Sequence, residues 1–373
     1  MTAPDDIHDL DRWLKGWLFD HALPLWWRVG ADHERGGFHE KIGQDGVPVP
    51  ANRPVRVAAR QAWVYAMAGE LGWTGPWREA RDHALAALSG PFARADGLFR
   101  DRVSPDGVPV DETPRPYEQA FAILAFSGAG REAEAVRTRE ALFARMGRPD
   151  GGVHEDAARG YPLGANPLMH LFEAVLAWVE IGTDPGWRDL AGRIGDLALT
   201  RLIDPSTGAL IETYGPDWSR PTDAEVWPGH QLEWGWILLW FARVMDRPAA
   251  EAPALRLIAL SEAHGTRDEV VQFAVDQTLR PLTYPARLWS QIERLHAGLA
   301  VGGWDEALKA AAVIRRFLDV PTPGLWRDRL SPDGTFVDEP APSSTLYHLI
   351  SAARALDAVC GGRARRLSGN LGP

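Results

Sequence analysis

The sequence contains one cysteine among 373 residues, and this scarcity limits what the protein can be. A single Cys360 can form neither an internal disulfide nor a cluster of thiolate metal ligands. Such cysteine usage fits the reducing cytoplasm, and we expect a cytoplasmic protein. The first residues are acidic and amphipathic rather than basic and then apolar, so we expect no signal peptide.

Long apolar runs and an excess of positive charge are also missing. No run reaches the roughly 18 uninterrupted apolar residues of a membrane span, so we expect no membrane partner. The formal net charge of −10 argues against nucleic-acid binding, because such proteins carry a basic patch or stripe. The expected partner is a small molecule, and the sequence leaves open whether the chain is a monomer or a homodimer.

Tryptophan and internal repeats, by contrast, are abundant. The chain has 17 tryptophans, which we read mainly as helix-packing residues, with a few available to stack on sugar rings. The segment "GLFRDRVSPDGVPVDE" (97–112) returns as "GLWRDRLSPDGTFVDE" (324–339), and looser relatives occupy 36–49, 151–163 and 208–218. Each has the composition of a short hairpin or extended loop. Repetition on this scale indicates stacked or circular repeats.

Between these loops, helices of two kinds alternate. One kind is apolar on nearly every side and is predicted at about 55–71, 115–127, 166–181, 229–245, 286–300 and 343–357. The other kind has a charged face and is predicted at about 8–28, 75–91, 130–146, 185–202, 250–263 and 302–318. A helix that is apolar all round is buried, whereas an amphipathic helix faces water. The alternation predicts an all-α (α/α)6 barrel with hairpin loops at its mouth, formed by one domain over residues 1–373.

The polar residues of the apolar helices fall near the helix starts. In an alternating barrel the inner helices run in the same direction, so we expect these residues to meet at one mouth. Burying ionisable groups is costly unless they are paired, which makes a chance origin improbable. The candidate residues are Arg60, Tyr117, Asn166, His170, His230, Glu233, Trp289, Glu293 and His348.

This residue set suits proton transfer on a sugar. Histidine moves protons near neutral pH, and two histidines can take a proton from one carbon and return it to another. Glu233 lies one helical turn from His230 and is expected to orient its ring. An arginine and a tyrosine can stabilise an enediolate. The set therefore predicts aldose–ketose isomerisation or epimerisation at C2.

Several alternatives remain open at this point. His230 and Glu233 with a further histidine resemble a metal site, although the His-Glu-x-x-His spacing of many zinc enzymes is absent. Glu233 and Glu293 could serve a glycoside hydrolase or a lyase, but the histidines would then have no role. A non-catalytic sugar-binding protein is a third alternative. Individually, a histidine can be a satisfied core residue, Arg60 a structural ion-pair member and Tyr117 a packing residue.

At these residues the sequence resembles the N-acylglucosamine 2-epimerase family. The motifs that carry the resemblance are "RVAARQAW", "YEQAF", "NPLMHLFEA", "WPGHQLEWGW" and "LYHL", and they extend over essentially the whole chain. The family fold is the (α/α)6 barrel. The resemblance implies that His230 and His348 form the acid/base pair, that Glu233 orients a histidine, and that His170 assists ring opening or substrate binding.

Further roles come from the same resemblance. Arg60, Tyr117, Asn166, Arg220 and Trp289 match substrate-binding positions, and we assign Glu293 to substrate binding as well. The family's isomerases imply no cofactor and no metal. Ser344 departs from the pattern, because some isomerases carry glutamine there. We therefore expect a cytosolic isomerase of D-mannose and D-fructose or a close analogue, with a sugar 2-epimerase as the alternative and a glycoside hydrolase as a weaker one.

Overall fold

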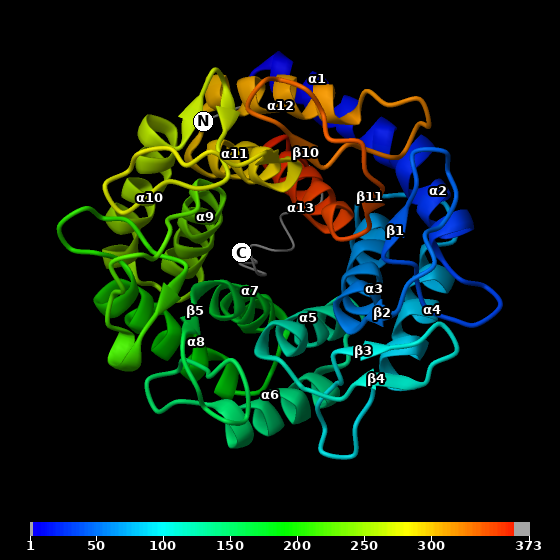
Figure 1. Cartoon of the computed structure of the whole chain (residues 1–373), viewed down its shortest axis with the longest axis horizontal. Helices are drawn as coiled ribbons and strands as arrows, with labels where there is room; N and C mark the ends of the chain where they lie inside the picture. Colours follow the sequence, from blue (N-terminus) through cyan, green and yellow to red (C-terminus); the bar gives the residue numbers. More distant parts are fainter. Residues whose placement is uncertain (1–2, 362–373) are drawn as a thin grey trace, which may run out of the picture. The chain divides into compact units, whose positions relative to one another are not determined.

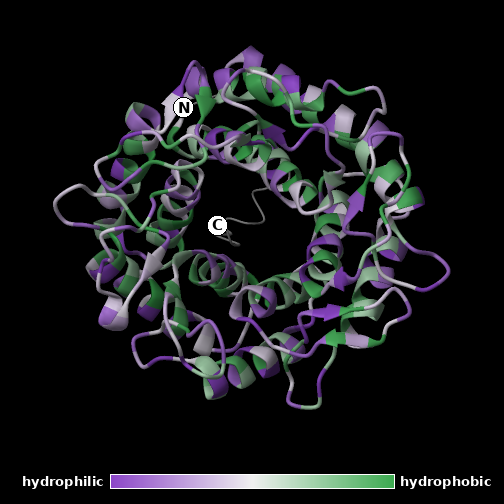
Figure 2. Ribbon diagram, viewed as in Figure 1, coloured by the Kyte–Doolittle hydropathy of each residue, from purple (hydrophilic) through white to green (hydrophobic). Residues whose placement is uncertain are grey.

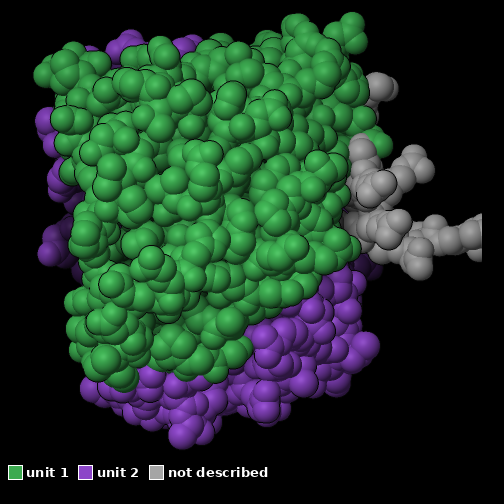
Figure 3. Space-filling model, turned by 90° about the vertical axis from the view of Figure 1, so that its right-hand side faces the viewer, with its two compact units in different colours: residues 1–92, 102–111, 285–373 green, residues 93–101, 112–284 purple. Residues whose placement is uncertain are grey.

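The computed structural model describes residues 3–361, and within them the chain forms two compact units. Figure 3 shows unit 1 (residues 1–92, 102–111 and 285–373) in green and unit 2 (residues 93–101 and 112–284) in purple. The two units are described separately below. The prediction of one domain over residues 1–373 stays a prediction, and its ends at 1–2 and 362–373 lie outside the described residues.

Unit 1 consists of apolar helices that each pack on an amphipathic one, and Figure 1 labels these helices. Its apolar helices are α3 (Val55–Glu70), α11 (Leu288–Val301) and α13 (Thr345–Val359). Helix α3 packs on α4 (Trp77–Ser89), α11 packs on α12 (Trp304–Leu318), and α13 contacts both α3 and α11. The amphipathic N-terminal helix α1 (Asp5–Trp17) packs on α12 and α13, and it continues through η1 (Leu18–Ala22), α2 (Leu23–Leu25) and η2 (Trp26–Gly30).

Unit 2 repeats this pairing. Its apolar helices are α5 (Pro116–Ser127), α7 (Ala165–Ile181) and α9 (Pro228–Val244). They pack respectively on α6 (Glu132–Met146), on α8 (Gly186–Leu197) with its extension η3 (Ala198–Leu202), and on α10 (Glu251–His264). Two short 3-10 turns, η4 (Pro216–Trp218) and η5 (Pro248–Ala250), lie in the connections. Figure 2 shows the amphipathic helices with hydrophilic and hydrophobic residues interleaved, as expected of helices with one polar face.

The predicted helix boundaries agree with the structure to within about three residues when η1, α2 and η2 are counted with α1, and η3 with α8. Pro116 and Pro228 occupy the first helical position of α5 and α9, where the missing proline N–H costs nothing. Helix α11 begins two residues later than predicted because Ala286 and Arg287 are extended and pair as strand β9. No helix among residues 3–361 is both long enough and apolar enough to cross a membrane.

The strands are short, and they join the loops that precede the apolar helices. They pair as β1 (Lys41–Ile42) with β11 (Ala341–Pro342), β9 (Ala286–Arg287) with β10 (Arg329–Leu330), β2 (Arg53–Pro54) with β3 (Arg102–Val103) and then β4 (Pro109–Asp111), β5 (Leu163–Gly164) with β6 (Thr213–Tyr214), and β7 (Thr266–Arg267) with β8 (Val270–Val271), all antiparallel. The predicted hairpin at 97–112 is present as β3–β4. In both copies of its "SPDG" turn the glycine, Gly107 or Gly334, has a φ of +80° or +84°, which a side chain would oppose.

Candidate active site

In unit 1 the candidate site centres on His348. This histidine is in the first turn of α13, and its Nδ1 lies 2.7 Å from Oε1 of Glu293 on α11. Both side chains are buried. An ionised carboxylate can only accept a hydrogen bond, so the imidazole donates from Nδ1 and its Nε2 is left as the basic atom. Glu293 thus contacts the histidine, and its assignment to substrate binding stays a prediction.

Aromatic and cationic groups surround this pair. The Trp289 ring lies 5.9 Å from the His348 ring, and the Tyr347 ring lies 4.9 Å from it on another side. The guanidinium of Arg60, from α3, stands 5.2 Å from the Tyr347 ring centre. Unit 1 thus brings together Arg60, Trp289, Glu293 and His348, four residues that the sequence had singled out on three helices.

A half-buried histidine close to the same pair is neutral. His296, one turn after Glu293 on α11, has its pKa lowered to about 4, mainly because burial penalises the charged ring. Its Nδ1 is 3.4 Å from Oγ of Ser351. Since this pKa lies far below neutrality, His296 is uncharged at pH 7.

In unit 2 a second histidine–glutamate pair centres on His230. Nδ1 of His230, in the first turn of α9, lies 2.7 Å from Oε2 of Glu212, and both residues are buried. The Trp227 ring lies 5.0 Å from the imidazole at an angle of 31°. The local chemistry therefore matches that at His348, with a carboxylate on Nδ1 and an indole against the ring.

Glu233, the predicted orienting residue of His230, has a different neighbour. Its Oε1 lies 3.8 Å from Nδ1 of His170, and Oε2 of Glu173 lies 3.2 Å from the same nitrogen. The sequence had predicted a His-x-x-Glu contact on α9. A contact of that spacing is found on α7, between His170 and Glu173, because residues three apart share a helix face there. The close Nδ1 contact of His230 is with Glu212, and the orientation of His230 by Glu233 stays a prediction.

The cluster around His170 is the part of unit 2 with the ligand types that a metal prefers. His170, Glu173 and Glu233 are buried, and each offers one ligand atom within 4.8 Å of the others. One imidazole and two carboxylates at this spacing could hold a divalent cation. The sequence predicted no metal, and chelation tests that prediction.

The remaining predicted residues are all in unit 2. The Tyr117 ring lies 5.3 Å from the His170 ring, and Oδ1 of Asn166 is buried with no hydrogen-bond partner among residues 3–361. A buried acceptor without a partner is what a ligand-binding amide would show. Arg220 donates to the carbonyl oxygens of Leu202 at 2.7 Å and Arg201 at 3.1 Å, so its guanidinium holds its own loop. Its role in substrate binding stays a prediction.

Sequence reasoning missed Glu212, although a signal was present. The fifth residue of each recurring loop is acidic, as in "GGFHE", "GLFRD", "GGVHE", "GALIE" and "GLWRD". These residues are Glu40, Asp101, Glu155, Glu212 and Asp328, and each stands shortly before an apolar helix of its unit. This recurring acidic position is the signal that could have pointed to a partner for a polar group at a helix start.

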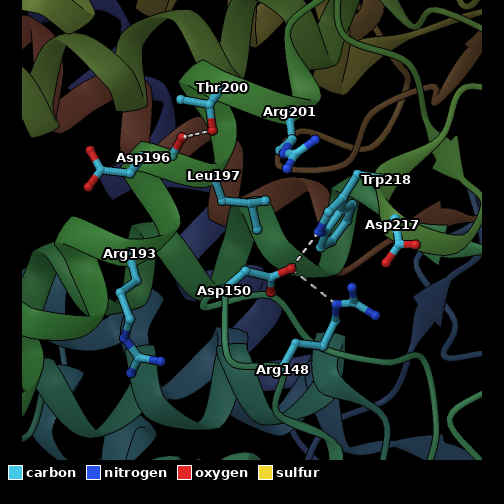
Figure 4. Close-up of a pocket in the computed structure, with 9 residues that line it drawn as sticks. All are labelled: Arg148, Asp150, Arg193, Asp196, Leu197, Thr200, Arg201, Asp217 and Trp218. Carbon is cyan, nitrogen blue, oxygen red and sulfur yellow. Dashed lines mark hydrogen bonds and ion pairs between the residues drawn. The ribbon is translucent and has the colours of Figure 1, made fainter.

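A separate hollow of about 300 Å3 lies in unit 2, and none of the predicted site residues lines it (Figure 4). Its wall consists of Arg148, Asp150, Arg193, Asp196, Leu197, Thr200, Arg201, Asp217 and Trp218. Some of these charges are already paired, since Nε of Arg148 is 3.4 Å from Asp150 and Nε of Arg193 is 3.1 Å from Asp189.

Comparison with known proteins identifies the family. The model of the N-acylglucosamine 2-epimerase family matches residues 36–352. The chain belongs to this family. The chain is 40% identical to the mannose-6-phosphate isomerase of Rhizobium meliloti (strain 1021), over 94% of this chain and 98% of that protein. It is 28% identical to the D-mannose isomerase of Thermobifida fusca, over 91% and 93% of the two chains.

The family assignment also fixes the fold. A crystal structure of D-mannose isomerase superposes with a TM-score of 0.84 at 18% identity, covering 95% of this chain and 99% of that one. Likeness at this level of identity speaks for the fold, and the fold is the all-α (α/α)6 barrel of the epimerase and isomerase family, as helix alternation predicted. Membership also makes the chain an enzyme of the isomerase class, which includes the epimerases.

Proposed function

We propose that the protein is a sugar aldose–ketose isomerase that interconverts D-mannose and D-fructose or a close analogue. The observation that carries this proposal is that His230 and His348 form equivalent pairs with a glutamate. In each pair the histidine Nδ1 lies 2.7 Å from an oxygen of a buried glutamate. Isomerisation moves a proton from C2 to C1, and two histidines can divide these two transfers between them. Relatives named mannose-6-phosphate isomerase and D-mannose isomerase support the same reaction type.

In the proposed reaction a histidine, which we assign as His348, removes the proton from C2 of the open-chain sugar. The electron pair forms the C1–C2 double bond of a cis-enediolate, with the negative charge on O1. His230 then delivers a proton to C1 while the proton of O2 passes to O1, and O2 becomes the ketone oxygen. The exchange of the two histidine roles is equally consistent with the contacts. Arg60 and Tyr117 are proposed to stabilise the enediolate oxygens, and His170 and Asn166 to bind the sugar and assist ring opening.

The decisive experiment is proton NMR of EDTA-treated protein with D-mannose in D2O, repeated with D-mannose 6-phosphate. Fructose, or its 6-phosphate, with deuterium at C1 is the expected product. Glucose with deuterium at C2 would replace this proposal with the 2-epimerase alternative, which the family name favours. Loss of turnover on EDTA treatment, restored by a divalent cation, would overturn the metal-free mechanism and point to the His170–Glu173–Glu233 cluster.

Location and partners are proposed on the basis of composition. We propose a cytoplasmic enzyme, because one cysteine in 373 residues suits a reducing compartment. Its partner is a sugar, with neither nucleic acid nor membrane, and its assembly is a monomer or a homodimer. Fractionation of the native cell and light scattering of the purified protein test these two points.

A further inference from the structure

We propose that Glu212 is a positioning residue for His230, supplied by a loop, and that the proton transfer at His230 depends on it. This inference rests on the proposed function, in which His230 handles the proton at one sugar carbon. Oε2 of Glu212 lies 2.7 Å from Nδ1 of His230. The other oxygen, Oε1, is buried and accepts no hydrogen bond from residues 3–361. The imidazole is therefore the main described partner of this carboxylate.

The backbone of Glu212 is fixed on both sides. Its N–H donates to the carbonyl of Glu225 at 2.9 Å, and its carbonyl accepts from the N–H of Ala165 at 2.9 Å. Ala165 is the first residue of α7, and Glu225 precedes α9. One residue thus ties together the segments that lead into the two helices carrying His170 and His230.

The segment leading into α9 places the indole of Trp227 against the imidazole of His230. Oε2 of Glu225 accepts from Nε1 of Trp227 at 2.8 Å, and Oε1 accepts from the hydroxyl of Tyr284 at 2.9 Å. The Trp227 ring in turn lies against His230. The imidazole is therefore held in two ways, by a carboxylate on Nδ1 and by an indole against its ring, and both partners belong to one hydrogen-bonded network.

The loop that carries Glu212 is anchored beyond it as well. The hydroxyl of Tyr214 donates to the carbonyl of Leu202 at 2.8 Å and accepts from the N–H of Ile211 at 3.2 Å. Figure 4 shows the next anchor, Trp218, whose Nε1 donates to Asp150 at 2.8 Å. Trp218 has a φ of +60°, a conformation that non-glycine residues adopt only where the surroundings enforce it. These hydrogen bonds hold the loop on both sides of Glu212.

Glu212 differs from the acidic residues at the equivalent positions of the other repeats in the partner of its carboxylate. At the equivalent positions, Glu40 pairs with Arg56 at 2.8 Å and Asp328 pairs with Arg287 at 2.7 Å, so the carboxylate meets a permanent cation. Oε1 of Glu155 accepts from the backbone N–H of Gly164 at 2.8 Å. At Glu212 the partner is an imidazole. A position that elsewhere stabilises loop structure here faces a group that gains and loses a proton.

The physical role follows from this pairing. A carboxylate on Nδ1 selects the tautomer with the proton on Nδ1, keeps Nε2 available, and stabilises the imidazolium that forms when Nε2 takes up a proton. Glu212→Gln removes the negative charge at nearly constant volume and leaves the backbone hydrogen bonds in place. We expect kcat to fall by about 10²-fold or more while KM changes by less than about threefold, because the lost interaction acts in the transition state.

The matched control is Asp217→Asn, which removes one negative charge from an exposed position in the same loop, and we expect it to leave kcat and KM unchanged. The second readout needs no substrate. The 15N shifts of His230 report the tautomer, which we expect to be Nδ1–H in the wild type and in D217N but a mixture in E212Q. The tautomer measurement tests the role of Glu212 even if the substrate is a different sugar.

Two results would overturn the inference. One is an E212Q enzyme with kcat within about threefold of wild type and an unchanged His230 tautomer. The other is a fall in kcat that accompanies lost thermal stability with the tautomer still Nδ1–H, which would make the role structural. If E212Q does not fold, Glu212→Asp is measured by the same readouts. It keeps the charge, so we expect the Nδ1–H tautomer and an intermediate kcat, and a kcat equal to that of wild type or a lost tautomer preference would count against the proposal.

Discussion

The two histidine–glutamate pairs are alike in chemistry and different in construction. In unit 1 both members come from helices, His348 from α13 and Glu293 from α11. In unit 2 the histidine comes from α9 but its glutamate, Glu212, comes from the loop before β6. The distance from Nδ1 to the carboxylate oxygen is 2.7 Å in each. The same local geometry is therefore reached once by helix packing and once by a hydrogen-bonded loop.

This difference determines what each pair depends on. Glu293 is placed by the contact of α11 with α13, which is stabilised by many buried apolar side chains. Glu212 is placed by a small number of hydrogen bonds at Ala165, Glu225, Tyr214 and Trp218. Remote substitutions should therefore disturb the loop-borne pair more readily than the helix-borne pair.

The largest expected effect comes from removing either histidine, which tests whether the two pairs are equivalent in function. His230→Ala and His348→Ala are each expected to lower kcat by about 10²–10⁴-fold, the usual contribution of a general acid or base. Steady-state kinetics with D-mannose measures the loss, and circular dichroism checks folding. Retained turnover in either folded variant would remove that histidine from the mechanism.

The next effect compares the two carboxylates directly. Glu293→Gln should lower kcat by about 10²-fold, as Glu212→Gln should, because each removes the charge that stabilises an imidazolium. The variants are compared under identical conditions with kcat and KM determined separately. A large effect of E293Q beside a negligible effect of E212Q would show that only the helix-borne pair assists proton transfer.

Most of the fold could be predicted from the sequence because the signal is repeated at every turn of the chain. Helix α7 is apolar on nearly every side, while α12 carries a charged face, so the alternation of buried and exposed helices is visible without coordinates. The strand pairing was less accessible. Leu163 pairs with Tyr214, some fifty residues further along the chain, and two-residue strands leave no alternation to read.

The site residues also fall into those that could be predicted from the sequence and those that could not. His170, His230 and His348 could be found because each is a polar residue near the start of an apolar helix. Their partners could not all be found in this way. The sequence favoured Glu233 for His230 because it is three residues away on the same helix, but side-chain direction across an interface depends on packing that sequence spacing does not contain. The partner on the loop, Glu212, is eighteen residues before its histidine.

A smaller effect tests whether the loop-borne pair is the more easily disturbed. Tyr214→Phe removes the hydroxyl that bonds Leu202 and Ile211, next to Glu212. The lost buried hydrogen bond is worth about 1 kcal/mol of folding stability. We expect kcat to fall by at most about fivefold, the change that would follow if all of this energy served to hold Glu212 in the transition state. The matched control is Tyr65→Phe on α3, which removes a buried hydroxyl bond to Leu23 in unit 1 and should lower thermal stability without lowering kcat. Equal effects on kcat would show that the loop is no more critical than the helix packing.

The smallest effect concerns stability rather than turnover. It is expected at His296 on α11, the helix that also carries Glu293. His296 has a pKa of about 4 in the folded protein against an ordinary value of 6.5, so between these values the unfolded chain binds a proton that the folded chain does not. Its contribution to the free energy of unfolding is fully present above pH 6.5 and is lost as the pH falls toward 4, at up to about 1.4 kcal/mol per pH unit. His296→Leu should flatten this slope in urea titrations at pH 7.0, 6.0 and 5.0, whereas the exposed His264→Leu should not. If the free energy of unfolding of H296L depends on pH as strongly as that of the wild type, other groups govern the acid sensitivity. The neutral His296 then makes no significant contribution to it.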